Sequence, residues 1–431
     1  MKENVVFTIC AKNYIGLAQI LEQSVLASNV DTDFLVFVAD EILDADILAS
    51  LPTNVIIARS VLNLTSDTWD DLSFKYNLTE FCTSIKPAVF LYLLENSGYN
   101  KIIYLDPDIY VFSELKPIYD ALNVQSIVLT PHMSLISEHY TGELPDTDFL
   151  GNGIFNLGFC GLRNDLVSTK MCKWWHSKLL NNCFIDPYLN TFTDQKWMDY
   201  LPAFFTSEEL CVSRHLGLNI APWNFFERKI ISVDGKLMVQ WRDDSTGNKI
   251  YPVVFVHYSG YNYAELKEGR VIQNNVSSLH DYEDIKLLTD NYANCIQKNR
   301  EVFDRFIHLD YTYNSYKSGT KITSFHRRIY RSLMNKGEKI VNPFECTDQS
   351  FFVRLKKAGM VGNTKVNLDK VDKSNLRGVK TKLKLFNRLT KLMYRLIGFE
   401  RYSLFIKLLR PFSRYESQIH LIDKRYEQDN I

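Results

Sequence analysis

The sequence lacks several features that would assign its class directly. Its eight cysteines form no C-x-x-C pair and no zinc-ligand spacing. No run of eighteen apolar residues occurs, so no segment has the composition of a membrane-spanning helix. No G-x-G-x-x-G follows the first apolar run, and there is no P-loop, kinase motif set or Ser-His-Asp order. We therefore expect a reduced intracellular protein without a disulfide scaffold, a zinc finger or a dinucleotide-type phosphate loop.

The chain also lacks net charge, because 50 Lys/Arg balance 50 Asp/Glu. This balance hides a split. Residues 371–414 contain twelve Lys/Arg and two Asp/Glu, whereas residues 1–370 contain 36 and 44. The length of 431 residues allows two or three domains. We expect an α/β domain over residues 1–263, a helical extension over 264–340 and a basic helical region over 341–431.

Strand and helix patterns alternate in the first third of the chain. Apolar runs at Asn4–Cys10, Phe34–Ala39 and Asn54–Ala58 have the length of strands, and Ile15–Ser28 has apolar residues at helical spacing. Thr83–Asn96 predicts a further helix, with a proline in its first turn. This alternation is typical of parallel strands in a doubly wound sheet. The expected fold class is therefore α/β.

The most informative stretch is the apolar run Ile102–Leu105, which leads directly into Asp106-Pro107-Asp108. A buried strand that ends in two carboxylates places them at the edge of the sheet where ligands bind in open α/β folds. Carboxylate oxygens suit Mg²⁺ or Mn²⁺. Asp-Pro-Asp is also ordinary turn chemistry, and the tripeptide alone favours a plain turn. The preceding strand and the motifs downstream favour the metal site.

Three later stretches add polar groups to this pattern. Asn156 lies in the glycine-rich stretch Gly151–Arg163, which indicates either a close approach of the backbone or a β-bulge. Asp194 and Gln195 follow Thr193, a predicted helix N-cap, which leaves Asp194 the alternative of a cap-adjacent charge. His257 ends the apolar strand that begins at Pro252, and by itself it would be a core histidine.

These features together, in this order, resemble metal-dependent glycosyltransferases of the GT-A type, especially family 8. The likeness covers residues 4–263 and rests on four motifs, which are Phe7–Tyr14, Tyr104–Asp108, Phe155–Gly158 followed by Asp194-Gln195, and His257–Gly260. It implies a GT-A fold with a Rossmann-like mixed sheet. The implied activity is transfer of a sugar, with retention, from a nucleoside-diphosphate-sugar donor. We expect a UDP-sugar donor and an acceptor hydroxyl in polysaccharide or glycolipid synthesis.

The resemblance also implies roles for individual residues. Mn²⁺ or Mg²⁺ would be held by Asp106, Asp108 and His257. The donor would be bound by Thr8, Tyr14, Lys86, Asp106 and Gly260. The catalytic residues would be Asn156, Asp194 and Gln195. One position departs from the family pattern His-x-x-Gly-x-x-Lys, because Tyr263 stands where the lysine is expected and the nearest lysine is Lys267.

Alternatives remain at the level of residues and of function. Lys86 could equally be a solvated lysine at a helix start, and the tryptophans and tyrosines are more often core residues than sugar platforms. A sugar-nucleotide nucleotidyltransferase would share a related fold, although it would carry a glycine-rich basic loop where this chain has Cys10–Asn13. A non-catalytic nucleotide-binding or scaffold protein is the alternative from another class. No signature of nucleic-acid binding is present.

The basic segment 379–409 predicts an amphipathic helix with a break at Gly398. Such a helix suits the surface of an anionic membrane, where a lipid-linked acceptor would be found. Packing of its apolar stripe against the acidic part of the chain is slightly favoured, because amphipathic helices usually face a core. We expect a cytoplasmic protein, with peripheral contact at the inner membrane face as the hypothesis for this segment.

Overall fold

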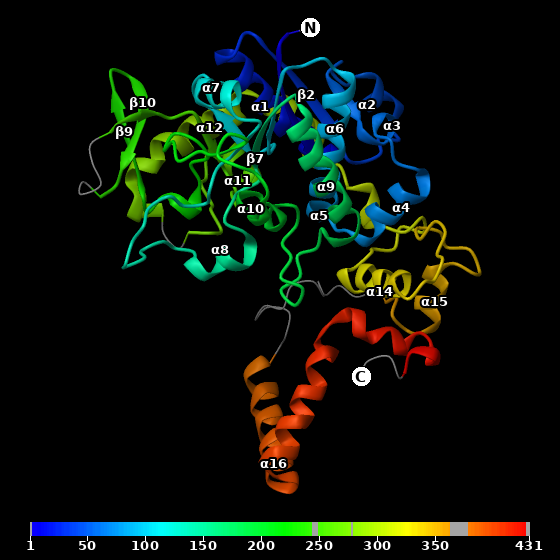
Figure 1. Ribbon diagram of the computed structural model, residues 1–431. Helices are drawn as coiled ribbons and strands as arrows, with labels where there is room; N and C mark the ends of the chain where they lie inside the picture. The colour runs from blue at the N-terminus through cyan, green and yellow to red at the C-terminus, as the bar shows by residue number, and fades with distance from the viewer. Residues whose placement is uncertain (1, 244–248, 277–278, 363–377, 428–431) are drawn as a thin grey trace. The chain divides into compact units, whose positions relative to one another are not determined.

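The chain is organised around a mixed seven-stranded sheet (Figure 1). The computed structural model describes residues 2–243, 249–276, 279–362 and 378–427. In spatial order the strands are β3 (Val55–Ile57), β2 (Thr32–Val38), β1 (Asn4–Cys10), β4 (Lys101–Leu105), β7 (Phe159–Arg163), β6 (Ile127–Leu129) and β8 (Leu210–Val212). Strands β3, β2, β1 and β4 are parallel, whereas β7 is antiparallel to both of its neighbours. The expected α/β class with a mixed sheet is confirmed.

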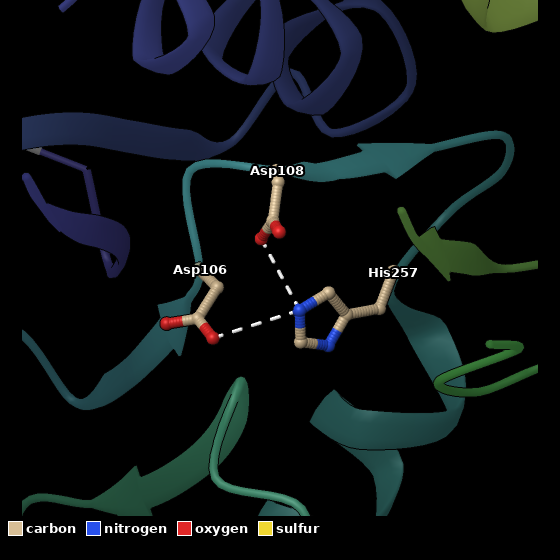
Figure 2. Close-up of side chains that lie close together, drawn as sticks. All are labelled: Asp106, Asp108 and His257. Atoms are coloured by element: carbon tan, nitrogen blue, oxygen red, sulfur yellow. Dashed lines mark ion pairs between the residues drawn. The ribbon is translucent and has the colours of Figure 1, made fainter. Parts of the chain in front are cut away.

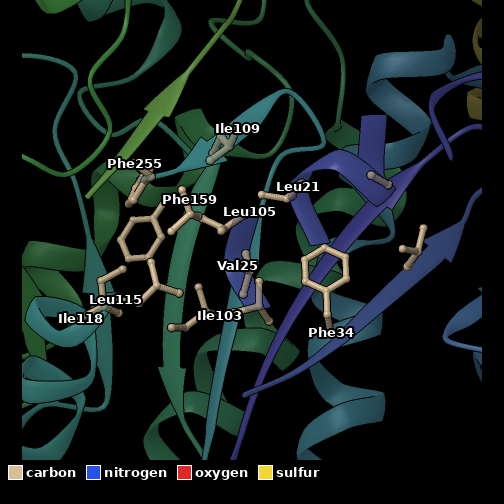
Figure 3. Packing of buried hydrophobic residues seen from close by; sticks show 14 of the residues in the cluster. Leu21, Val25, Phe34, Ile103, Leu105, Ile109, Leu115, Ile118, Phe159 and Phe255 are labelled. Atoms are coloured by element: carbon tan, nitrogen blue, oxygen red, sulfur yellow. The ribbon is translucent and has the colours of Figure 1, made fainter. Parts of the chain in front are cut away.

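Helices cover both faces of this sheet, which explains why β1 and β4 are apolar without alternation. On one face, Ile103 and Leu105 of β4 pack with Leu21 and Val25 of α1 (Ile15–Ser28) (Figure 3). On the other face, Phe7 of β1 lies edge-on against a phenylalanine of α6 (Lys86–Asn96), with 4.8 Å between the ring centroids. The carboxyl end of β4 is therefore held in place from both sides.

Most of the remaining helices belong to the same α/β unit. They are α2 (Ala45–Ala49), α3 (Ala58–Val61), α5 (Leu78–Ser84), α7 (Lys116–Val124), α8 (Asp146–Asn152), α9 (Leu166–Asn182), α10 (Leu201–Phe204), α11 (Tyr263–Lys267), α12 (Lys286–Lys298) and α13 (Arg300–Ile307). The single helix expected over Thr83–Asn96 is wrong in its extent. The chain forms α5 and α6 with a break at Ile85, so that Lys86 is the first residue of α6 and Pro87 lies in its first turn.

Two smaller sheets accompany the main one. Strand β5 (Ile109–Val111) follows the Asp-Pro-Asp turn and pairs antiparallel with β12 (Phe255–His257). Strands β9 (Arg228–Val233), β10 (Lys236–Trp241) and β11 (Tyr251–Pro252) form an antiparallel sheet. The β5–β12 pair matters most for the site, because it brings His257 back to the end of β4.

The chain divides into two compact units, Met1–Leu64 with Leu78–Tyr311, and Thr65–Asn77 with Thr312–Ile431. This division differs from the expected boundary at residue 263. Residues 264–311 belong with the α/β unit because α13 packs on α1 and α12 packs beside the β5–β12 pair. The Tyr292 ring of α12 stacks on Tyr258, 4.0 Å away, directly after β12. The other expected boundary, at residue 340, stays a prediction.

The second unit includes a short segment from early in the chain. Helix α4 (Ser66–Lys75) joins α14 (Ser324–Asn335) and α15 (Phe351–Lys357). The buried Arg327 guanidinium of α14 donates to the carbonyl oxygens of Phe74, at 2.6 Å, and Tyr76, at 2.7 Å. The basic helical region expected over 341–431 contains α15, and its residues 363–377 and 428–431 lie outside the described residues.

Candidate metal and donor site

Three side chains meet at the carboxyl end of β4. His257 Nε2 lies 3.2 Å from Asp108 Oδ1 and 3.7 Å from Asp106 Oδ2 (Figure 2). The His257 side chain is 5% exposed, whereas the Asp106 and Asp108 side chains are 28% and 18% exposed. The expectation that His257 lies beside the Asp-Pro-Asp turn is confirmed, although about 150 residues separate them in the sequence.

Backbone pairing explains how these residues come together. The Asp106 amide donates to Gly158 O at 2.8 Å, and the Ile109 amide closes the turn by donating to Asp106 O at 3.0 Å. In the antiparallel register of β5 and β12, His257 is opposite Ile109, the residue after Asp108. The imidazole therefore enters the site from β12 as a consequence of strand pairing rather than of loop conformation.

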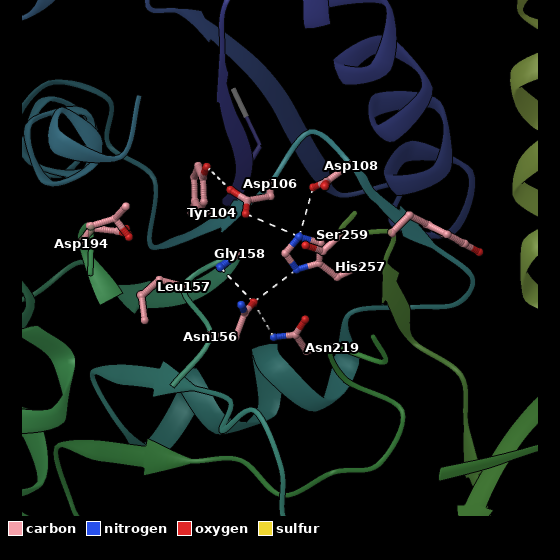
Figure 4. Close-up of polar contacts among 12 residues, drawn as sticks. Tyr104, Asp106, Asp108, Asn156, Leu157, Gly158, Asp194, Asn219, His257 and Ser259 are labelled. Carbon is pink, nitrogen blue, oxygen red and sulfur yellow. Dashed lines mark hydrogen bonds and ion pairs between the residues drawn. The ribbon is translucent and has the colours of Figure 1, made fainter. Parts of the chain in front are cut away.

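A polar cluster fixes the orientation of the imidazole. Asn156 Oδ1 lies 3.2 Å from His257 Nδ1 and also accepts hydrogen bonds from the Gly158 amide and from Asn219 Nδ2, both at 3.1 Å (Figure 4). Because two donors already point at this oxygen, we assign the Nδ1–H tautomer to His257, which donates the third hydrogen bond. Nε2 is the nitrogen that faces the two aspartates, so its lone pair would be available to an ion bound between them, as required of a metal ligand.

Each aspartate is also held by a tyrosine. The Tyr104 hydroxyl donates to Asp106 Oδ1, and the Tyr263 hydroxyl lies 2.9 Å from Asp108 Oδ2. In both residues the other carboxylate oxygen faces His257. The three candidate ligand atoms are therefore oriented before any ion arrives.

The charges of the three groups perturb one another. Burial would lower the pKa of His257, but the two neighbouring carboxylates raise it above its ordinary value. Burial would raise the pKa of Asp108, but the charge and hydrogen bond of His257 hold that pKa below its ordinary value. For Asp106 burial prevails and raises the pKa, although Lys86 and His257 oppose it.

The three side chains fit one divalent ion. Each offers one ligand atom, and these atoms all lie within 4.8 Å of one another. Ligands bound to one ion at about 2.1 Å lie roughly 3 to 4.2 Å apart, so a small contraction completes the site. Two carboxylate oxygens and one imidazole nitrogen, with open positions for water or phosphate, suit Mn²⁺ or Mg²⁺.

A buried ion pair lies next to this trio. Lys86 Nζ is 2.6 Å from Asp194 Oδ2 and donates to Leu157 O at 2.7 Å, and it lies 4.1 Å from the centroid of the Tyr104 ring. The side chains of Lys86 and Asp194 are 1% and 3% exposed. The alternative of a solvated Lys86 is therefore wrong, because the break at Ile85 turns this residue inward.

The remaining predicted residues lie around the same edge of the sheet. Thr8 is fully buried in β1, and its hydroxyl has no hydrogen-bond partner in the described part of the chain. Tyr14 packs edge-on against Tyr263, and burial together with the Asp108 charge raises the pKa of Tyr14 to about 12. Gln195 Nε2 donates to Asn152 O at 2.9 Å. Gly260 lies three residues after His257 in a positive-φ turn. Donor-binding and catalytic roles for these residues stay predictions.

The N-cap expected at Thr193 is wrong. The helix that follows is a 3₁₀ helix, η2 (Gln195–Tyr200), whose N-cap residue is Asp194 without a side-chain cap bond. Thr193 has a φ of 45°, in the left-handed region rather than in the extended region typical of an N-cap, and its hydroxyl donates to Asp194 Oδ1 at 3.2 Å. A tertiary contact explains this difference, because the Asp194 carboxylate forms a buried ion pair with Lys86.

Sequence reasoning missed the residues that hold the ligands. Tyr104 belongs to the motif Tyr104–Asp108 but received no role of its own. Neither Asn219 nor Trp223, whose ring meets the His257 ring at 5.2 Å and 90°, was predicted to lie at the site. Asn219 lies in the apolar stretch Leu216–Ala221, where a buried amide needs a partner. That requirement is the one signal that could have pointed to it.

We expect Gly158→Ala to disrupt the site. A Cβ at position 158 would lie 2.6 Å from His257 Nδ1 and 2.9 Å from Asn156 Oδ1, so the imidazole would have to move. Affinity for Mn²⁺ should fall about 10- to 100-fold, as measured by electron paramagnetic resonance of the free ion. Gly151→Ala is the matched control, because a Cβ there meets nothing within 4 Å. Equal affinities in the two variants would contradict this account of the glycine.

Comparisons with known proteins gave matches among solved structures alone. No family model matches the chain, and no curated protein matches it. The galactosyltransferase LgtC, in complex with donor and acceptor sugar analogs, is 18% identical over 71% of this chain and 97% of its own, with a TM-score of 0.39. The bifunctional glycosyltransferase WbbM is 15% identical over 70% of this chain and 51% of its own, with a TM-score of 0.38.

The glycosyltransferase GlyE of Streptococcus pneumoniae is 12% identical over 74% of this chain and 67% of its own, with a TM-score of 0.36. All three proteins are described as glycosyltransferases. Because their TM-scores are below 0.5, the likeness carries no weight for the chemistry of this chain.

Proposed function

We propose that this chain is a metal-dependent glycosyltransferase that moves a sugar from a nucleoside-diphosphate-sugar donor to an acceptor hydroxyl. The observation that carries the proposal is the convergence of Asp106, Asp108 and His257 at the carboxyl end of β4. Open α/β sheets bind their ligands at this edge. The family resemblance of the sequence supports a UDP-sugar donor, retention of configuration and a saccharide or lipid-linked acceptor.

The chemistry of the proposed site follows from its charges. A divalent ion held by the trio would bind the donor diphosphate and stabilise the negative charge that develops on it as the sugar leaves. Asn156, Tyr104 and Tyr263 orient the three side chains that would hold this ion, through hydrogen bonds to His257, Asp106 and Asp108 respectively. Lys86 places a cation behind Asp106, against the ring of Tyr104. Asn156, Asp194 and Gln195 are proposed as the groups nearest the reacting sugar.

A panel of nucleotide sugars tests this proposal. The purified full chain should hydrolyse at least one donor slowly, with release of the nucleoside diphosphate, and only when Mn²⁺ or Mg²⁺ is present. Release of pyrophosphate from a nucleoside triphosphate and a sugar 1-phosphate would instead identify a nucleotidyltransferase. If neither reaction occurs with any donor and the chain shows no metal-dependent nucleotide binding, the result would favour a non-catalytic binding or scaffold protein.

The proposal includes an anionic membrane surface as the partner of α16 (Val379–Leu409). This helix breaks at Gly398, whose φ of 78° and ψ of 167° are accessible almost to glycine alone, and folds back on itself (Figure 1). Residues 379–409 contain eight Lys/Arg and one acidic residue. Large apolar side chains on both arms are exposed, Leu396 at 76% and Phe399 at 69%. Basic, apolar and exposed helices of this kind lie flat on anionic bilayers.

No helix in the described part of the chain is long and apolar enough to cross a bilayer. Contact of α16 with the membrane would therefore be peripheral. Truncation of the tail is a poor test, because residues after α16 pack on α14, where Ser332 Oγ donates to Glu416 O at 2.9 Å. Point substitutions in the full chain avoid this loss of packing.

We expect Leu392→Glu with Leu396→Glu to weaken flotation with anionic vesicles about 10-fold or more, because two apolar contacts are lost and two negative charges are added. The matched control is Leu43→Glu with Leu166→Glu, at leucines that are 81% and 87% exposed outside α16. The wild-type chain and the control should float with phosphatidylglycerol vesicles and remain behind with phosphatidylcholine vesicles. Equal flotation of all three proteins, or flotation of none, would reject the membrane role and favour packing of the stripe.

A further inference from the structure

The two candidate metal-binding aspartates share one arrangement. In Asp108, Oδ1 lies 3.2 Å from His257 Nε2, while Oδ2 lies 2.9 Å from the Tyr263 hydroxyl. In Asp106, Oδ2 lies 3.7 Å from the same nitrogen, while Oδ1 accepts the Tyr104 hydroxyl. One oxygen of each carboxylate thus faces the common centre, and the other is held by a phenol.

We propose that Tyr263 is a positioning residue that sets the orientation of Asp108 for the metal ion, in the same way that Tyr104 sets Asp106. The inference rests on the proposed function, since it assumes an ion between these side chains. It adds a residue from outside the ligand set, contributed by the first turn of α11.

The surroundings of Tyr263 fix its hydroxyl at this place. The side chain is buried, and its ring meets Tyr14 edge-on with 5.9 Å between the centroids. Its hydroxyl also lies 2.8 Å from Tyr258 O, so two acceptors compete for one proton. A carboxylate attracts a proton donor more strongly than a neutral carbonyl does. The hydrogen bond to Asp108 is therefore the favoured one while that residue is ionised.

A neutral donor at this position has a specific advantage over a cationic one. An ammonium group 2.9 Å from Asp108 would form an ion pair and reduce the negative charge available to a bound ion. A phenol orients the carboxylate and leaves that charge in place. We therefore expect Tyr263 to raise the affinity of the site for the ion rather than to contact the reacting sugar.

The test compares Tyr263→Phe with Tyr261→Phe in the full chain. Each change removes one hydroxyl from a buried tyrosine, but that of Tyr261 has no hydrogen-bond partner in the described part of the chain. Titration of Mn²⁺ in the presence of UDP, followed by electron paramagnetic resonance, measures the affinity without turnover. Tyr263→Phe should weaken Mn²⁺ binding about 10-fold or more, and Tyr261→Phe should change it less than about twofold.

Further readouts separate positioning from a general structural effect. The urea midpoint of Tyr263→Phe should stay close to that of Tyr261→Phe, and kcat should recover at saturating Mn²⁺ while the metal concentration for half-maximal rate rises. Tyr104→Phe should weaken Mn²⁺ binding in the same direction through Asp106. Unchanged binding in Tyr263→Phe, or an equal loss in Tyr261→Phe, overturns the inference alone. A wild-type chain that binds no Mn²⁺ with UDP overturns the inference and the proposed function together.

Discussion

We expect Asp108→Asn to reduce sugar transfer by about 10³-fold or more, because the proposed ion loses a charged ligand and the transition state loses several kcal/mol of stabilisation. Asparagine retains one carbonyl oxygen, which can still accept the hydrogen bond from Tyr263. The fold should therefore survive, and the circular dichroism spectrum and urea midpoint should stay close to those of the wild type. The measurement is the initial rate with the best donor of the nucleotide-sugar panel.

Asp120→Asn is the matched control for this substitution, since Asp120 is 56% exposed on α7 and pairs with the exposed Lys116 one turn away. It should leave the rate unchanged. If Asp108→Asn transfers sugar at a rate close to that of the control, or if the wild type is fully active in EDTA, transfer does not depend on a metal ion at this site.

Lys86→Met should destabilise the α/β unit by about 3 to 5 kcal/mol, because Asp194 would keep a buried charge without its partner and Leu157 O would lose its donor. Urea unfolding measures this loss. The control is Lys116→Met, which breaks a pair whose side chains are 67% and 56% exposed and should cost about 1 kcal/mol or less.

A double substitution extends this test to the pair itself. Lys86→Met with Asp194→Asn should be less destabilised than the sum of the two single variants, since the second change removes the unpaired charge. Simple additivity, or a cost of Lys86→Met no greater than that of Lys116→Met, would contradict a buried ion pair between these residues.

Local patterns in the sequence were sufficient for the parts of the fold that depend on neighbouring residues. The strand Asn4–Cys10 and the helix Ile15–Ser28 were predicted with the bounds that the structure gives. The strand before Asp106 and the strand ending at His257 were also identified, because buried strands are continuous apolar runs. The place of Asp106 and Asp108 followed from the rule that ligands bind at the carboxyl edge of such sheets, whereas His257 reaches them from the separate two-stranded sheet of β5 and β12.

The contacts that complete the site could not be predicted in the same way. Lys86 and Asp194 are 108 residues apart, and Asn156 and Asn219 are 63 residues apart. Neither separation produces a period or a motif in the sequence. The partner of a single buried polar residue can be identified only once the positions of the strands and helices in space are known.

The division into units illustrates the same limit. Residues 65–77 lie between elements of the α/β unit in sequence, yet their backbone carbonyls are bound by Arg327 of α14. Composition does not change at either end of this segment, so no boundary could be read from it. A domain assigned from sequence alone would be a continuous segment, whereas each of the two units consists of two separate segments.

The most direct test of the central claim is isothermal titration of UDP into the purified full chain, with and without Mn²⁺. If the diphosphate is bound through an ion held by Asp106, Asp108 and His257, nucleotide binding should depend on that ion. We predict saturable binding of UDP in Mn²⁺ that is lost in EDTA and lost in Asp108→Asn. Binding of equal affinity with and without the ion, or no binding in either condition, would contradict the proposed site.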